Sequence, residues 1–213
     1  MKISKILDFM GVLSIGLDNV SDSERLIFLK YLNQAHYELY NHTAALNDDL
    51  IINEAKTTTI NINNVDLSQR PLSINKIFVD GYIRPLKELK LIEFVDYTKK
   101  TSSGSPCVFT WQVKKLSIYP LMKDTPYNLD IWYTPVHVDL EENTPEDEIP
   151  YPPSFHYVLL DGALYYLFQD EGGFKNSAQV DSQTVKWEKG KQDLYSYLFH
   201  KSGEVMSTHS NAI

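Results

Sequence analysis

Residues 149–173, IPYPPSFHYVLLDGALYYLFQDEGG, mark the point at which the pattern of the chain returns from strand to helix. Pro152 and Pro153 fix an extended backbone, and Ser154 is a residue type that caps helices. The apolar residues that follow recur at intervals of three and four over three turns, which predicts one buried helix face. Gly162 and Ala163 lie in the middle of that face, where small side chains let a second helix approach closely.

Two helices are predicted earlier in the chain, at residues 1–17 and 21–42, from apolar residues at the same spacing. Ser21 and Glu24 form the pattern of a capping box at the start of the second helix. His36 lies within its apolar stripe. We expect His36 to be buried or interfacial and hydrogen-bonded to a neighbour, because no second histidine or carboxylate stands at metal-ligand spacing on that face.

The middle of the chain follows the period of two that is typical of strands. Strands are predicted at residues 57–63, 108–113, 116–119 and 129–133, and residues 74–83 form two apolar arms around Asp80-Gly81, a hairpin signal. Residues 85–97 fit a short helix better than a strand. Five or six short strands usually close into a small barrel or sandwich that protects their edges.

The sequence therefore predicts an α+β fold, in which N- and C-terminal helices form a bundle around an inserted small antiparallel β barrel or sandwich. The expected boundaries are a first helical half at residues 1–50, the β domain at 51–149, a second helical half at 150–200 and a C-terminal tail at 201–213. A last helix at residues 177–199 places Val180, Trp187 and Leu194 seven residues apart. The tail is small and polar, so we expect it to become ordered only on a partner.

Composition excludes several classes of protein. The net charge of −8, from 28 acidic and 20 basic residues, argues against a protein whose main task is to bind phosphates. The single Cys107 excludes an intrachain disulfide framework. No apolar run approaches the roughly 20 residues that cross a bilayer, so we expect a soluble protein with no membrane contact.

The sequence contains no catalytic signature, and we expect no enzymatic activity, no cofactor and no metal site. Two alternatives stay open. Acidic residues between 139 and 148 include paired carboxylates such as Glu141-Glu142, which could run a small hydrolase, although a solvated loop explains them better. Four aromatic residues of the β region could form a platform for a carbohydrate-binding or adhesion module, although such residues usually fill small β cores: Trp111, Tyr119, Trp132 and Tyr133.

The order of several segments resembles a known family. These segments are SDSERLIFLKYLNQAHYELY at residues 21–40, the VDG turn at 79–81, SGSPCVFTW at 103–111, KLSIYPLMKDTPYNLDIWYTP at 115–135, and the stretch at 149–173 quoted above. In this order they resemble the head-to-tail adaptor proteins of tailed bacteriophages, also called connector or tail tubular protein A-like ring proteins. The positions that carry the resemblance are Gly104, Pro106, Pro120, Tyr133, Pro150 and the Gly162-Ala163 pair.

The resemblance implies a structural virion protein that forms a ring of twelve copies below the portal, joins capsid to tail and lines the DNA channel. Its implied partners are its own copies, the portal protein and the next tail protein, a nozzle or tail tube, while double-stranded DNA passes through without specific binding during ejection. The implied location is the head-tail junction of the virion, after assembly in the host bacterial cytoplasm. The residues expected at portal or subunit interfaces are Tyr31, Tyr195, Lys201, Val205, Met206 and Ile213.

Overall fold

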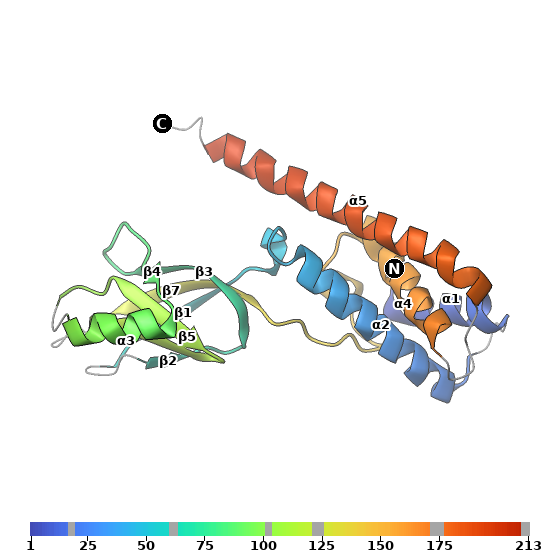
Figure 1. Ribbon diagram of the computed structural model, residues 1–213, viewed down its shortest axis with the longest axis horizontal. Helices are drawn as coiled ribbons and strands as arrows, with labels where there is room; N and C mark the ends of the chain where they lie inside the picture. The colour runs from blue at the N-terminus through green and yellow to red at the C-terminus, as the bar shows by residue number, and fades with distance from the viewer. Residues whose placement is uncertain (17–19, 60–63, 101–103, 121–125, 171–176, 210–213) are drawn as a thin grey trace. The chain divides into compact units, whose positions relative to one another are not determined.

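The computed structural model describes residues 1–16, 20–59, 64–100, 104–120, 126–170 and 177–209, and the side chains of the last helix from residue 178 to residue 202. The chain divides into two compact units (Figure 1). The helical unit combines Met1–Asp49 with His137–Ile213, and the β unit is Leu50–Val136. All the strands and one helix lie in the β unit and the other helices lie in the helical unit, so the predicted α+β class is confirmed.

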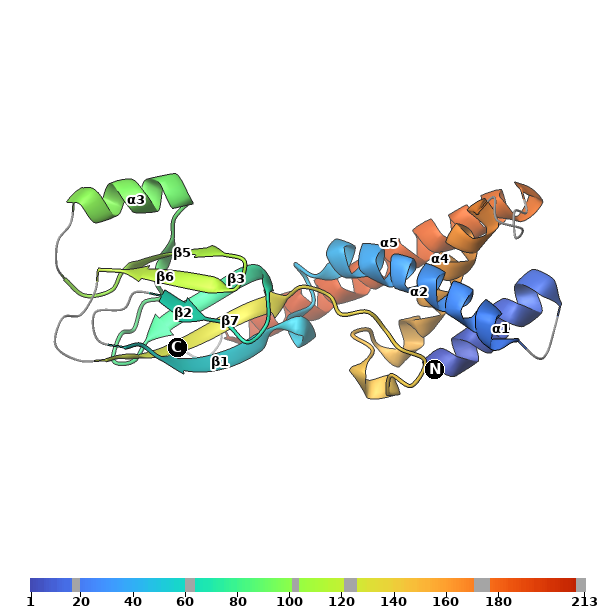
Figure 2. The ribbon, with the colours of Figure 1, turned by 90° about the horizontal axis from the view of Figure 1, so that it is seen from below.

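Four helices form the helical unit: α1 (Ile3–Ile15), α2 (Asp22–Thr43), α4 (His156–Gln169) and α5 (Ser177–His209). The predicted capping box begins α2, where the Ser21 amide donates to Glu24 Oε2 at 2.8 Å and the Glu24 amide donates to Ser21 Oγ at 3.4 Å. Short 3₁₀ turns lie at Asp48–Leu50, Glu146–Glu148 and Pro153–Phe155. α4 packs against α1, α2 and α5, so it is the central helix of this unit (Figure 2).

The small residues of α4 are the points of closest helix approach, as predicted. A methyl group added at Gly162 would lie 2.7 Å from the Trp187 ring and 2.8 Å from Ala35 Cβ, so α2 and α5 both contact α4 at this position. Ala163 and Trp187 are fully buried. Gly190 of α5 has a similar role, since an added methyl would lie 3.0 Å from Val158. Glycine lowers the stability of a helix, and the close packing against Val158 at Gly190 offsets this cost.

Both ends of the closing helical pair differ from the prediction. Ser154 does not cap α4: it lies in the 3₁₀ turn Pro153–Phe155, and the helix begins at His156 with no side-chain cap. The prolines set the backbone angle of this turn and the Phe155 amide donates to Pro152 O at 2.8 Å, so no capping side chain is used. α5 continues beyond the predicted end at Phe199 to His209, because helix propagation requires no further apolar residues.

The β unit contains two open sheets. The three-stranded sheet has the order β1 (Ile52–Thr57), β7 (Asn128–Pro135), β3 (Pro71–Val79), and all its pairs are antiparallel. The four-stranded sheet has the order β2 (Asn64–Asp66), β6 (Lys115–Tyr119), β5 (Val108–Gln112), β4 (Lys87–Glu88), and its β4–β5 pair is parallel. Apolar residues from both sheets form one core, consistent with a sandwich, and neither sheet closes into a barrel.

The predicted hairpin around Asp80-Gly81 is only half correct. Gly81 has a φ of +81° and the Tyr82 amide donates to Val79 O at 2.9 Å, so the turn forms. The second arm is not a strand: β3 pairs with the distant β7, and Ile83 is 96% exposed. Pairing with β7 places Ile77 and Val79 in the core, which the short second arm could not do.

Two other predictions in this region need adjustment. β1 ends at Thr57, where the predicted strand at residues 57–63 was expected to begin, and residues 60–63 lie outside the described part. The helix predicted at residues 85–97 is α3 (Leu91–Lys100), preceded by β4. Phe94 is its buried residue, whereas Ile92 and Val95 of the predicted apolar face are exposed. The strands predicted at residues 108–113, 116–119 and 129–133 are confirmed as β5, β6 and β7.

Candidate assembly interface

His36 of α2 is hydrogen-bonded to the segment that follows the β unit. Its Nε2 lies 3.1 Å from the Val138 carbonyl oxygen, to which it can only donate, and its Nδ1 lies 2.9 Å from the Tyr151 hydroxyl, which donates to the His36 carbonyl oxygen at 3.2 Å. One turn earlier, Asn33 Nδ2 donates to Leu140 O at 3.0 Å and Asn33 Oδ1 accepts from the Leu140 amide at 2.7 Å. Burial lowers the pKa of His36 to about 4. His36 is thus a neutral, buried histidine with neighbours, as predicted.

The acidic segment that follows has structural partners. Arg25 of α2 donates to Glu142 at 2.6 Å and also pairs with Asp8 of α1. Glu146 pairs with the N-terminal ammonium of Met1, and that hydrogen bond lowers the pKa of Glu146. A general acid needs a raised carboxyl pKa, which Glu146 does not have.

The aromatic residues of the β unit do not form one platform. Trp132 on β7 of the three-stranded sheet is 39% exposed, and its indole nitrogen donates to Asp130 at 2.9 Å. Trp111 on β5 of the other sheet packs partly against the core and donates to Glu88 at 3.0 Å. Tyr133 is buried. The two tryptophans lie on different sheets, so they do not present the paired rings that a sugar-binding surface would use.

A polar network joins three helices inside the helical unit. Lys191 of α5 is 9% exposed, and its Nζ lies 2.6 Å from Glu38 Oε1 and 2.7 Å from Glu188 Oε1. The Tyr166 hydroxyl of α4 donates to Glu38 as well. Burial acts to raise the pKa of Glu38, but the hydrogen bonds from Lys191 and Tyr166 outweigh it and lower that pKa. The network fixes the register of α5 against α2 and α4.

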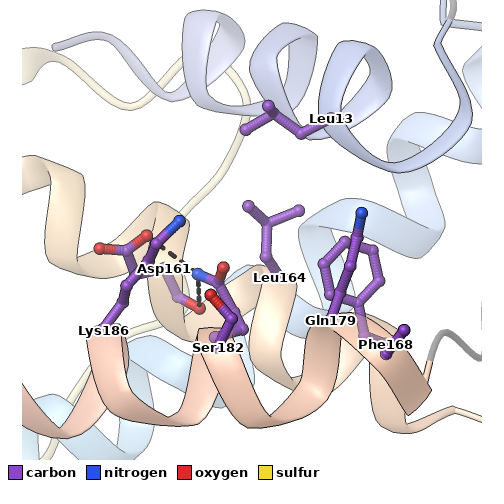
Figure 3. A pocket seen from close by; sticks show the side chains of 9 residues that line it. Leu13, Asp161, Leu164, Phe168, Gln179, Ser182 and Lys186 are labelled. Carbon is purple, nitrogen blue, oxygen red and sulfur yellow. Dashed lines mark hydrogen bonds between the residues drawn. The ribbon is translucent and has the colours of Figure 1, made fainter.

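A pocket of about 400 Å³ lies between the ends of α1, α4 and α5 (Figure 3). Leu13, Leu164 and Phe168 supply its apolar lining. Gln183 Nε2 donates to both the backbone oxygen and Oδ1 of Asp161 at 2.9 Å, and burial raises the pKa of Asp161. The Asp161 carboxylate is therefore already engaged by the Gln183 amide.

Large aromatic side chains remain exposed along both flanks of α5. On one flank, the Tyr197 and Phe155 rings lie 5.2 Å apart beside Tyr157. On the other, the Tyr195 and His42 rings lie 5.3 Å apart. Exposed aromatic residues are enriched in protein interfaces, so α5 is the element best suited to bind other proteins.

The residues predicted at interfaces have different positions in the structure. Tyr195 is exposed on α5, and Lys201 Nζ pairs with Asp49 Oδ2 at 2.5 Å. Tyr31 is 5% exposed and its hydroxyl donates to Asp170, so it belongs to the core of the helical unit and is unavailable to a partner. Val205 and Met206 lie in α5 in the stretch whose side chains are not described, and Ile213 lies outside the described residues.

In the described residues, no three or more histidine, cysteine or acidic side chains are grouped so that they could hold a metal ion. No helix there is long and apolar enough to cross a membrane. Exposed aromatic side chains on the flanks of helices are typical of a surface that binds other proteins.

The comparison with protein families identifies the kind of assembly. Residues 4–198 match the model of the SU10 adaptor protein family, so the chain belongs to that family. It is a structural adaptor protein of a phage, as the resemblance of its sequence segments implied. No individual curated protein matches the chain.

Proposed function

We propose that this adaptor forms a ring of twelve copies below the portal, where it joins capsid to tail and lines the channel through which DNA leaves. Membership of the adaptor family supports a position at the head-tail junction, and the order of its sequence segments resembles that of ring-forming connectors. The proposed location is the mature virion, after assembly in the host cytoplasm.

The main observation that supports a ring is the apolar surface that remains exposed on the helices after folding. Large apolar side chains on α1, α2, α4 and α5 remain open to solvent although the unit already has a complete core. Such a surface is typical of a subunit that binds further copies. Unlike faces on one subunit allow a heterologous contact, which closes a ring when the rotation allows. These side chains are Phe9, Val12, Leu13, Leu26, Ile27, Tyr37, Tyr157, Val185, Tyr195, Tyr197 and Phe199.

Two further contacts belong to the proposal. The end of α5 and the residues after it, with Tyr195, Lys201, Val205, Met206 and Ile213, bind the portal or a neighbouring copy, and the β unit binds the next tail protein. The net charge of −8 leaves few basic side chains to hold the DNA backbone, which suits a conduit through which DNA passes without specific binding.

Mass photometry and negative-stain imaging of the chain, alone and mixed with its portal, test the proposal. We expect a multiple-copy, ring-shaped complex in the presence of portal. A chain that stays monomeric with every virion component present would overturn it.

Removing residues 203–213 tests the portal contact. This truncation keeps Lys201 and its pair with Asp49, so we expect the thermal midpoint to stay unchanged while capture by immobilised portal weakens. Full retention of portal binding by the truncated chain would refute a docking role for this segment.

A further inference from the structure

The exposed face of α1 combines positive charge with apolar side chains. Lys2, Lys5, Phe9 and Val12 follow one another at intervals of three and four, so they form one seam along the helix. All four are exposed, and they line a groove of about 690 Å³. The acids of this groove, Asp8 and Glu146, already pair with Arg25 and the N-terminal ammonium, whereas Lys2 and Lys5 form no ion pair with a described residue.

α5 carries a matching seam of opposite charge. Its buried residues Trp187 and Leu194 form one heptad row, and a second row runs along the exposed side at alternating intervals of four and three. This second row contains two acids, three large apolar side chains and no base. Its members are Asp181, Val185, Glu188, Gln192, Tyr195 and Phe199, and the apolar three are 41 to 68% exposed.

The described part of one chain leaves both seams uncovered. α4 packs against α1 and against α5. Each seam has the spacing at which a second helix packs by inserting its side chains between those of the first. The α1 seam carries two lysines, and the α5 seam carries Asp181, which forms no ion pair with a described residue, and Glu188, which is paired with Lys191; the lysines and the acids complement each other, which favours another copy of the same chain as the partner.

We propose that the α1 seam of one copy packs along the α5 seam of the next. Lys2 and Lys5 then face the acidic positions, and Phe9 and Val12 bury against the apolar side chains of the α5 seam. Because the two seams differ, each copy uses both of them, one with each neighbour, and the contact can repeat around a ring. This inference rests on the proposed ring and names the surfaces that build it.

A pair of charge variants tests the contact. Variant X carries Lys2→Glu and Lys5→Glu, so both of its seams are acidic. Variant Y carries Asp181→Lys and Gln192→Lys, so both of its seams are basic. Glu188 is left unchanged because its Oε1 accepts from the buried Lys191. The matched control, Lys76→Glu with Lys115→Glu, makes the same charge change as X at exposed positions of the β unit.

We expect X alone and Y alone to need at least about tenfold higher concentration than the wild type to form the multiple-copy complex. An equimolar mixture of X and Y should assemble near the wild-type concentration, as an alternating ring, because each acidic seam then meets a basic one. The control should assemble like the wild type, and all variants should keep the wild-type thermal midpoint.

The outcomes separate this contact from the proposed function. If the wild type forms a ring and X or Y does so equally well, or if the mixture fails to recover, the contact is wrong and the ring stands. A wild type that never forms a multiple-copy complex with portal overturns the ring and the contact together.

Discussion

In the helical unit three helices meet at glycine and alanine, whereas in the β unit two open sheets bury alternate residues of their strands. The first arrangement depends on close fit at a few positions such as Gly162 and Ala163. The second spreads its core over many similar side chains. A single substitution should therefore reduce the free energy of unfolding most among the helices. In the β unit, changes of polar groups at the surface should reduce it less.

The largest expected effect is at Ala163. Ala163→Leu adds three carbons to a fully buried position, and we expect it to destabilise the protein by about 3 kcal/mol, at the upper end of the usual cost of overpacking. Ala45→Leu makes the same change at an exposed turn and should leave the thermal midpoint unchanged. Equal thermal midpoints for the two variants would show that the stability does not depend on the close approach of helices at Ala163.

Breaking the polar network should cost somewhat less. Lys191→Met removes the cation between Glu38 and Glu188, and we expect a loss of about 2 kcal/mol, because the partly buried Glu38 carboxylate then lacks its counter-charge and keeps only the hydrogen bond from Tyr166. Adding Glu38→Gln should restore part of the loss, since the neutral amide needs no counter-charge. Chemical denaturation of both variants measures the coupling, and simple additivity of the two effects would contradict a shared network.

The β unit should show a smaller, acid-dependent effect through Glu54. Burial acts to raise the pKa of Glu54, but hydrogen bonds from Lys56, Ser68 and Tyr133 lower it to about 2, from an ordinary value of 4.5. A depressed pKa contributes stability above pH 4.5 that is lost as the pH falls toward 2. We expect this contribution to be on the order of 1 kcal/mol after solvent screening.

Glu54→Gln tests this contribution. Its stability should change less with pH between 4.5 and 2 than that of the wild type, measured by denaturation at each pH. Identical pH profiles would rule out Glu54 as the source. The expected contribution of Glu54 to the stability of the β unit depends on pH. The close fit at Ala163 has no charge to titrate.

The smallest effect is expected at Glu146. Its partners are the N-terminal ammonium and the edge of His156, and the carboxylate is exposed, so Glu146→Gln should leave the thermal midpoint unchanged. Loss of a measurable activity with stability intact would favour the enzyme alternative instead.

Local patterns in the sequence predicted the parts of the fold that local forces decide. The capping box at Ser21 and Glu24 depends on residues three positions apart, and the apolar face of α4 with its small residues was visible in the local spacing; both are confirmed. The hairpin at Asp80-Gly81 failed because the turn signal is local, while the partner of β3 is the distant β7. A turn residue cannot indicate which of two possible strands buries more apolar surface.

The candidate interface was harder to predict for the same reason. Glu38 and Lys191 are 153 residues apart, so nothing in the local sequence joins them, although Glu188 and Lys191 stand three apart on one helix. The apolar rows of α5 are both visible as heptads, but only the packing of α4 shows that the row with Trp187 is the buried one. Tyr31 was expected at an interface because aromatic residues serve both in cores and on surfaces.

The hydrogen bonds of Asn33 and His36 have a mechanical consequence. The chain enters the β unit after the end of α2. On its return it is hydrogen-bonded to α2 at Val138 and Leu140, and at Pro150 to Asn47, which lies in the turn that follows α2. Both covalent crossings are thus anchored on one helix. A pull on the β unit acts on α2 as shear on several hydrogen bonds at once, and it also reaches α5 through the Lys201–Asp49 pair beside the first crossing. A load on the two connections to the β unit is therefore shared between the hydrogen bonds of α2 and the ion pair of α5.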